Sequence, residues 1–113
     1  MEADMSAGDL DRRVQFRRVT RMNTALGQEE TWADLGSPVW ASRRDVSDGE
    51  KAAAGGVFST VSARFQIRSS TFSRGITAKD MLTCDGREWE IVGIKEIGRR
   101  DRIEITATAR TDR

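Results

Sequence analysis

Apolar and polar residues alternate along two stretches of the chain, residues 61–68 and 103–110. Strict alternation is typical of a β-strand that buries one face and exposes the other to water. We therefore predict a strand over each stretch. The side chains expected to point into a core are those of Val61, Ala63, Phe65, Ile67, Ile103, Ile105, Ala107 and Ala109.

A tight hairpin is predicted at Asp85-Gly86. This pair separates the apolar runs 81–84 and 89–92, and Asp-Gly favours the two-residue turn that matches the twist of antiparallel strands. The apolar phase changes at Gly93, which indicates a β-bulge. The polar residues 98–101 predict a turn into the last strand.

The first half of the chain predicts one strand and then a loop. Val14 and Phe16 alternate with polar neighbours, and the alternation breaks at Arg18-Val19, which indicates a bulge or the end of the strand. Residues 23–30 are polar and contain a glycine, so they are predicted to form a loop between strands.

A second extended piece is predicted on either side of Gly36-Ser37-Pro38. Proline donates no ladder hydrogen bond, so Pro38 belongs at a strand start or on an edge. Trp32, Trp40 and Trp89 each lie within an apolar strand pattern. We therefore expect these three rings in the core, in preference to a stacking platform for nucleic-acid bases.

Two segments are predicted to be flexible. Residues 1–11 carry four acids and no base and predict a flexible N-terminal arm. In residues 47–58 the spacing of Ser47 and Glu50 fits a capping box and alanines follow, but Gly55-Gly56 ends any helix after about two turns. This stretch is expected to be a short helix or a mobile insertion.

The fold class that follows is mainly β. We predict a small antiparallel β-barrel or rolled sandwich of about five or six strands, with one short helix or long loop, because short strands with one wet face must close or pack on themselves. A length of 113 residues fits one domain, which we place at residues 12–113 behind the arm.

The amino-acid composition excludes most kinds of catalytic site. The chain has no histidine, no tyrosine and a single cysteine, Cys84, which excludes histidine triads, imidazole metal sites and an internal disulfide. Asp80, Asp85, Glu88 and Glu90 are the carboxylates that could hold a metal ion, but no accompanying motif singles them out. We expect no enzyme, no metal and no cofactor.

Charge argues against a protein that binds nucleic acid through bulk electrostatics. The 19 basic and 18 acidic residues give a net charge of +1. Residues 12–21 hold five arginines and no acid, and we expect these arginines to meet acids on a neighbouring strand or subunit. The basic residues around 99–102 are expected to form a solvated turn. No apolar run approaches the ~20 residues of a membrane span.

The order of motifs resembles the head–tail joining proteins of tailed phages, which also occur in gene transfer agents. The resemblance runs over residues 7–105 and is carried by residues 7–18, Gly27, Thr31-Trp32, Val39-Trp40-Ala41, Ser47, Glu50, residues 65–68, residues 78–82, Asp85-Gly86-Arg87 and residues 89–92. It implies a small β-barrel that assembles with identical subunits into a sixfold or twelvefold ring at the head–tail junction of the virion. The ring would join the portal or adaptor to the tail around passing DNA after assembly in the host cytoplasm.

The resemblance also directs attention to two groups of residues. The candidate interface with neighbouring subunits, portal or tail consists of Asp9, Asp11, Arg12, Arg13, Asn23, Leu26 and Gln28. The candidate channel or docking loop consists of Asp48, Gly49, Glu50, Lys51, Gly55 and Gly56. The alternative is a solitary SH3- or OB-like barrel that binds nucleic acid or a peptide through a concentrated basic or aromatic surface.

Overall fold

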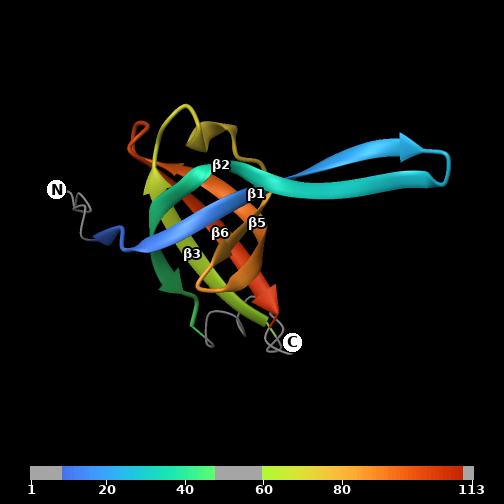
Figure 1. Cartoon of the computed structure of the whole chain (residues 1–113). Coiled ribbons are helices and arrows are strands. Elements are labelled where there is room, and N and C mark those ends of the chain that lie inside the picture. The colour runs from blue at the N-terminus through green and yellow to red at the C-terminus, as the bar shows by residue number, and fades with distance from the viewer. Residues whose placement is uncertain (1–8, 48–59, 111–113) are drawn as a thin grey trace.

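The computed structural model describes residues 9–47 and 60–110 and is built almost entirely from β-strands. The strands are β1 Arg12–Thr24, β2 Gly27–Asp45, β3 Thr60–Arg68, β4 Met81–Cys84, β5 Arg87–Ile97 and β6 Arg102–Arg110, and a 3-10 turn, η2 Ser73–Gly75, lies between β3 and β4. Every strand pairs with its neighbours in antiparallel fashion, and the order β1-β2-β3-β6-β5-β4 closes into a barrel. The predicted fold class is confirmed (Figure 1).

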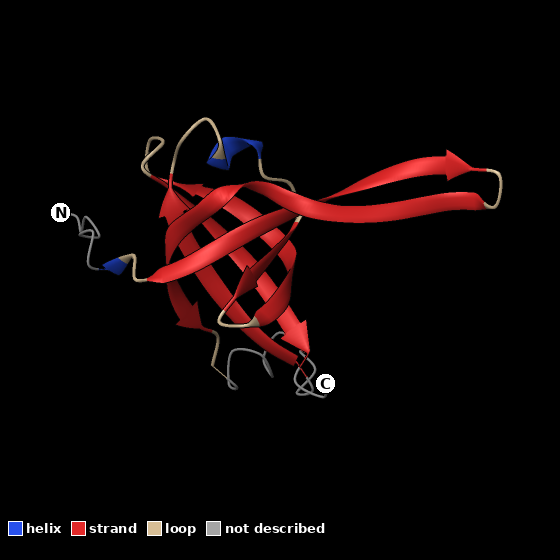
Figure 2. Ribbon diagram, in the orientation of Figure 1, coloured by secondary structure: helices blue, strands red, loops and turns tan. Residues whose placement is uncertain are grey.

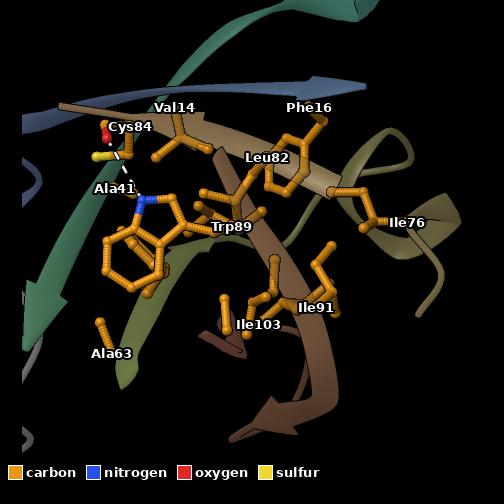
Figure 3. Close-up of a cluster of buried hydrophobic side chains, with 14 of the residues drawn as sticks. Val14, Phe16, Ala41, Ala63, Ile76, Leu82, Cys84, Trp89, Ile91 and Ile103 are labelled. Carbon is orange, nitrogen blue, oxygen red and sulfur yellow. Dashed lines mark hydrogen bonds between the residues drawn. The ribbon is translucent and has the colours of Figure 1, made fainter. Parts of the chain in front are cut away.

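The barrel is filled by side chains that point inward from all six strands (Figure 3). The indole of Trp89 is fully buried and meets the ring of Phe65 edge to face, with centroids 5.2 Å apart. Its Nε1 donates a 3.4 Å hydrogen bond to the carbonyl oxygen of Cys84. The inward positions predicted on β3 and β6 are confirmed, with Val61 half-buried at the margin of the core.

The predicted hairpin and bulge are both present. Asp85 and Gly86 have φ values of 54° and 75° and join β4 to β5, the conformation that an Asp-Gly turn supplies. The β5–β6 register shifts between Ile91 and Gly93, which places a bulge at the predicted position. The bulge turns the valine between them, Val92, outward, where 58% of its surface is exposed.

The β1–β2 pairing continues far beyond the barrel, and this is the largest departure from the sequence prediction. Only Gln15, Phe16 and Arg17 of β1 pair with β4, whereas the ladder with β2 runs without a break from Phe16 to the Thr24–Gly27 pair. Residues 18–24 and 27–33 therefore form a two-stranded ribbon that projects from the barrel (Figure 1). The prediction of a loop over residues 23–30 and of a strand break at Arg18-Val19 is wrong.

The irregularity in this strand pair lies inside the barrel instead. The register shifts between Val14 and Phe16, where Gln15 of β1 faces the three residues Gly36-Ser37-Pro38 of β2. Among the described strands, none pairs with Pro38, so its missing N–H group breaks no ladder hydrogen bond. The bulge thus accommodates the proline within a long strand.

Two of the three tryptophans are not core residues. Trp40 is 51% exposed and lies against the guanidinium of Arg13, 4.7 Å from the ring centroid, and Trp32 is half-buried on the ribbon. The prediction fails because Leu35, Val39 and Ala41 are the residues of β2 that face the core. Trp32 and Trp40 alternate with them and therefore lie on the outer face of the same strand. Trp89 alone of the three occupies the core.

Several expectations fall outside the described residues. The arm up to residue 8 and nearly all of the 47–58 stretch are among them, so the predicted flexibility of both remains a prediction. Within the described residues, Leu10 is buried at 5% exposure, so the chain already contacts the barrel before β1 begins. No helix in this part of the chain is long and apolar enough to cross a membrane.

Candidate functional site

The tip of the ribbon presents apolar side chains to solvent. Leu26 is 100% exposed and Met22 is 61% exposed. The turn that holds Leu26 is well defined, because the Thr24 hydroxyl donates to the carbonyl oxygen of Gly27 at 3.0 Å and accepts the N–H of Leu26 at 3.2 Å. Leu26 is therefore an apolar side chain without cover at the end of a projecting hairpin, and it stays a candidate contact residue.

The two faces of the ribbon are formed by cross-strand pairs. One face carries Val19 opposite Trp32, Arg21 opposite Glu30 and Asn23 opposite Gln28; the other carries Thr20 opposite Thr31 and Met22 opposite Glu29. The Arg21 Nε lies 2.7 Å from the Glu30 carboxylate. The structure therefore brings the predicted interface residues Asn23, Leu26 and Gln28 together at the tip.

The ribbon has no core of its own. Every residue from 18 to 33 is exposed except Val19 and Trp32, which are half-buried. A lone two-stranded hairpin is at best marginally stable in water, and its bare strand edges invite pairing with another chain. The ribbon is thus the part of the described protein that gains most from a partner.

An ion pair anchors the ribbon where it leaves the barrel. Arg18 donates from Nε to Asp80 Oδ1 at 2.8 Å and from Nη2 to Oδ2 at 2.9 Å, and its Nη2 also reaches the Gly75 carbonyl oxygen at 2.9 Å. Asp80 is 3% exposed and accepts the backbone N–H of Thr77 at 2.9 Å. These contacts join β1 to the segment that precedes β4, beyond the last β1–β4 pair.

Electrostatics favour this anchor in its charged form. Burial by itself raises the pKa of Asp80, but the hydrogen bonds from Arg18 and Thr77 and the charge of Arg18 outweigh burial, so the pKa of Asp80 is lowered. The pKa of Arg18 is raised, chiefly by its hydrogen bond to Asp80. The expectation that the 12–21 arginines meet acids on a neighbouring strand is confirmed by the pairs of Arg17 with Asp34 and of Arg21 with Glu30 on β2. The partner of Arg18, Asp80, instead lies in the loop before β4 and was not indicated by the sequence.

Packing at the ribbon base fixes the direction in which the ribbon leaves. The Gln15 amide donates to the carbonyl oxygens of Phe16 at 2.8 Å and Gly36 at 3.1 Å, which fills the bulge. Gly36 has φ +68°, and a Cβ there would lie 2.6 Å from Cε1 of Phe72, so this position requires glycine. The Phe72 ring in turn meets Phe16 edge to face at 6.1 Å.

The remaining predicted interface residues lie at the other end of β1 from the ribbon tip (Figure 1). Arg12 Nη1 binds Asp85 at 2.8 Å, and its Nε lies 3.9 Å from the Asp11 carboxylate. Arg13 stacks on Trp40. Asp9 also lies at this end. The structure therefore separates the predicted interface into two surfaces, one at each end of the strand.

A second charged cluster closes the barrel next to Arg12. Arg43 lies over the Trp89 ring at 4.8 Å and donates to Asp85 at 2.7 Å and to Asp45 at 2.8 Å. Burial raises the pKa of Asp85, but the hydrogen bond from Arg43 and the charge of Arg12 prevail, so the pKa of Asp85 is lowered. Burial and the Asp85 charge raise the pKa of the Cys84 thiol to about 11, as fits a small core residue.

The carboxylates do not form a metal site in the described part of the chain. Asp80 and Asp85 are both bound by arginines, whereas Glu88 and Glu90 are exposed on the outer face of β5. Across residues 9–47 and 60–110, no three acidic or cysteine side chains gather where they could hold a metal ion. The candidate channel residues Asp48, Gly49, Glu50, Lys51, Gly55 and Gly56 lie outside the described residues.

Comparison with solved structures finds the same fold in two proteins. A protein of Shigella flexneri 2a, solved in solution, matches with a TM-score of 0.72 and 26% identity over 96% of this chain and 100% of its own. A chain from the virion of a native gene transfer agent particle matches with a TM-score of 0.69 and 19% identity, over 89% of this chain and 94% of its own. No curated protein matches in sequence.

The sequence of the chain also matches the model of a protein family. The model of phage head completion proteins matches residues 5–110. This range includes the whole barrel, the ribbon and the segment between β2 and β3. The chain therefore belongs to the phage head completion protein family.

Proposed function

We propose that this chain is a structural protein of the virion that sits at the head–tail junction and joins the portal or adaptor to the tail. The observation that carries the proposal is the family match over residues 5–110. The likeness to a chain of a gene transfer agent virion supports it at the level of the fold. The proposed role requires no catalytic group, metal or cofactor.

In this proposal identical subunits form a sixfold or twelvefold ring around the DNA channel. A ring closes through a heterologous interface, so each subunit must offer two different surfaces that fit one another. The ribbon tip with Asn23, Leu26 and Gln28 supplies one candidate surface, and the opposite end of β1 with Asp9 to Arg13 supplies another. The net charge of +1 suits a channel that must later release DNA.

The partners are then other virion proteins. The portal or adaptor lies on one side of the ring and tail proteins on the other, and genomic DNA passes through without sequence-specific contacts. Assembly takes place in the host cytoplasm. The 47–58 stretch remains the candidate channel-facing or tail-docking element.

The location is tested by electron microscopy of particles that carry a label on this chain. We expect the label at the capsid vertex where the tail begins. Label distributed over the capsid shell, or at the far end of the tail, would contradict the proposal.

The two working elements are tested by deletion. Replacement of residues 21–30 by Asn-Gly closes the ribbon after the Thr20–Thr31 pair, and we expect a folded barrel that no longer enters particles. Deletion of residues 49–57 should leave the barrel folded while DNA retention or tail attachment fails. If the variant without residues 49–57 gave particles in wild-type yield and with wild-type DNA content, this stretch would have no role in DNA retention or tail attachment.

A further inference from the structure

Two loops meet at the end of the barrel from which the ribbon departs. One loop follows β3 and contains η2, and the other joins β5 to β6 (Figure 2). They are tied together by a 3.1 Å hydrogen bond from the N–H of Ser69 to the carbonyl oxygen of Asp101, and Arg68 pairs with Arg102 at the ends of β3 and β6. Side chains from both loops therefore share one surface.

This surface is strongly basic in a protein of nearly balanced charge. Arg68, Arg74, Arg99 and Arg100 are all exposed, and we call these four residues the arginine rim. Residues 68–75 and 98–101 contain these four bases and one acid, Asp101, which gives a local charge of 4 − 1 = +3 against +1 for the whole chain. The excess of positive charge is thus concentrated at one end of the barrel.

The rim arginines are not neutralised by acids of the described residues. The guanidinium of Arg74 donates to the Ser69 hydroxyl at 3.1 Å, and within residues 9–47 and 60–110 no ion pair engages Arg68, Arg74, Arg99 or Arg100. At the opposite end, Arg12 and Arg43 both bind Asp85. Arg100 also adopts φ 57°, a conformation in which asparagine or glycine is more usual.

The surroundings of the rim suit phosphate better than a protein surface. Ser69, Ser70 and Thr71 place hydroxyl groups between the arginines. The two large apolar residues of these loops are turned inward, since Ile76 is buried and the ring of Phe72 meets Phe16. Contacts to the DNA backbone are made by arginine and by hydroxyl side chains, whereas the centre of a protein interface is apolar. The ribbon tip, with Leu26 and Met22, has the opposite character.

We propose that the arginine rim binds the phosphate groups of double-stranded DNA without reading its sequence. Guanidinium groups match phosphate oxygens with two parallel hydrogen bonds, and up to four such contacts give weak, salt-sensitive binding. Weak binding is compatible with DNA that must slide past the rim. That this DNA is the packaged genome rests on the proposed function. The binding itself is a property of the isolated chain and can be tested without virions.

The test is an NMR titration of the full chain, labelled with ¹⁵N, with a 20-base-pair duplex of random sequence. We expect shifts in the amides of residues 68–75 and 98–101 and not in the ribbon. Four phosphate contacts predict an affinity loss on the order of 100-fold between 50 and 200 mM salt, from a slope of about −0.9 per contact. Absence of shifts at low salt overturns the proposal.

A matched pair of variants locates the binding. Arg99→Gln with Arg100→Gln should weaken binding and reduce the salt-dependent loss to about 10-fold, because two contacts remain. Arg44→Gln with Arg87→Gln removes the same charge from exposed positions away from the rim and should leave binding unchanged. Equal losses in the two variants would show that only total charge matters and would overturn the proposal.

The competing partner is an acidic peptide. A synthetic peptide of residues 1–11, with its four acids, is titrated under the same conditions. We expect no shifts at concentrations where DNA saturates the rim. Tighter binding of the peptide would reassign the rim to protein contacts and overturn the DNA proposal, while the virion location tested by labelling would stand.

Discussion

The barrel and the ribbon share two strands, β1 and β2, which pass from a buried environment into an exposed one. In β1, Val14 and Phe16 are 0% exposed within the barrel, whereas Met22, six residues beyond Phe16, is 61% exposed on the ribbon. The ladder between β1 and β2 continues through both regions. The β1–β2 pairing therefore extends through both regions. In the barrel, however, the two strands also pair with β4 and β3 and bury one face, whereas the strands of the ribbon pair only with each other within the described residues.

This difference assigns stability to one region and recognition to the other. Burial of apolar surface is the dominant favourable term in folding, and the barrel contains nearly all of it. The ribbon contributes little burial, but its base is fixed by the Arg18–Asp80 pair and by Phe72 against Gly36. A binding element that is already ordered loses less conformational entropy when its partner arrives.

The strongest test of this division is Trp89→Ala in the barrel. The substitution leaves a cavity and removes the contacts with Phe65 and Arg43. We expect a loss of about 3–5 kcal/mol in the free energy of unfolding, measured by chemical denaturation. A loss below about 1 kcal/mol would mean that the core does not depend on this ring.

Asp80→Asn should have the next largest effect, because it removes the charge that Arg18 binds and puts an NH₂ donor in place of one acceptor oxygen at a buried position. We expect a loss of about 1–3 kcal/mol at pH 7. Since the pKa of Asp80 is lowered on folding, its contribution is complete above the ~3.9 of an unfolded aspartate and is lost as the pH falls through the lowered value. The difference from wild type should therefore shrink below about pH 4.

The control for Asp80 is Asp34→Asn. Asp34 pairs with Arg17 at 3.3 Å, but its side chain is 67% exposed. Exposed pairs contribute about 0–1 kcal/mol. A larger loss for Asp34→Asn than for Asp80→Asn would place the anchor of the ribbon elsewhere.

Gly36→Ala tests the junction between the two regions. Alanine at φ +68° is strained by about 1–2 kcal/mol, and its Cβ would press on Phe72. Gly75→Ala is the matched variant, since a Cβ there meets nothing within 4 Å. Thermal unfolding should separate the two, and equal melting temperatures would argue against a close contact at the ribbon base.

Leu26→Asp should have the smallest effect on folding. The side chain contacts no core, so the free energy of unfolding should change by less than about 0.5 kcal/mol. Incorporation into particles should nevertheless fall, because the charge opposes burial at the tip. Normal incorporation would show that the tip is not the contact surface.

The sequence predicted those elements whose signals are local. The Asp85-Gly86 hairpin, the bulge at Gly93 and the inward side chains of β3 and β6 each follow from a pattern within about ten residues. Such patterns depend on one face of a strand being buried. Predictions from these patterns are correct where the strand buries one face in the barrel.

The ribbon and its anchor could not be predicted in the same way. Residues 23–30 form strands that bury neither face, so no apolar alternation marks them. Asp80 is 62 residues from Arg18, and nothing in the local sequence singles out this carboxylate. Trp40 was misplaced because apolar residues stand on both sides of it, and Val39 and Ala41 take the inward positions. The candidate interface residues Asn23, Leu26 and Gln28 lie together at the end of a hairpin that was predicted as a loop, and their role as an interface stays a prediction.

The shortness of the β1–β4 seam has a mechanical consequence. Only three residue pairs, at Gln15, Phe16 and Arg17, join these strands, and the projecting hairpin begins at the next residue. A force applied to the tip of the ribbon would break these pairs one after another, beginning with the pair nearest the ribbon. The bidentate Arg18–Asp80 contact lies next to the first of these pairs. It would therefore have to break before a force on the ribbon could separate β1 from β4 and open the barrel.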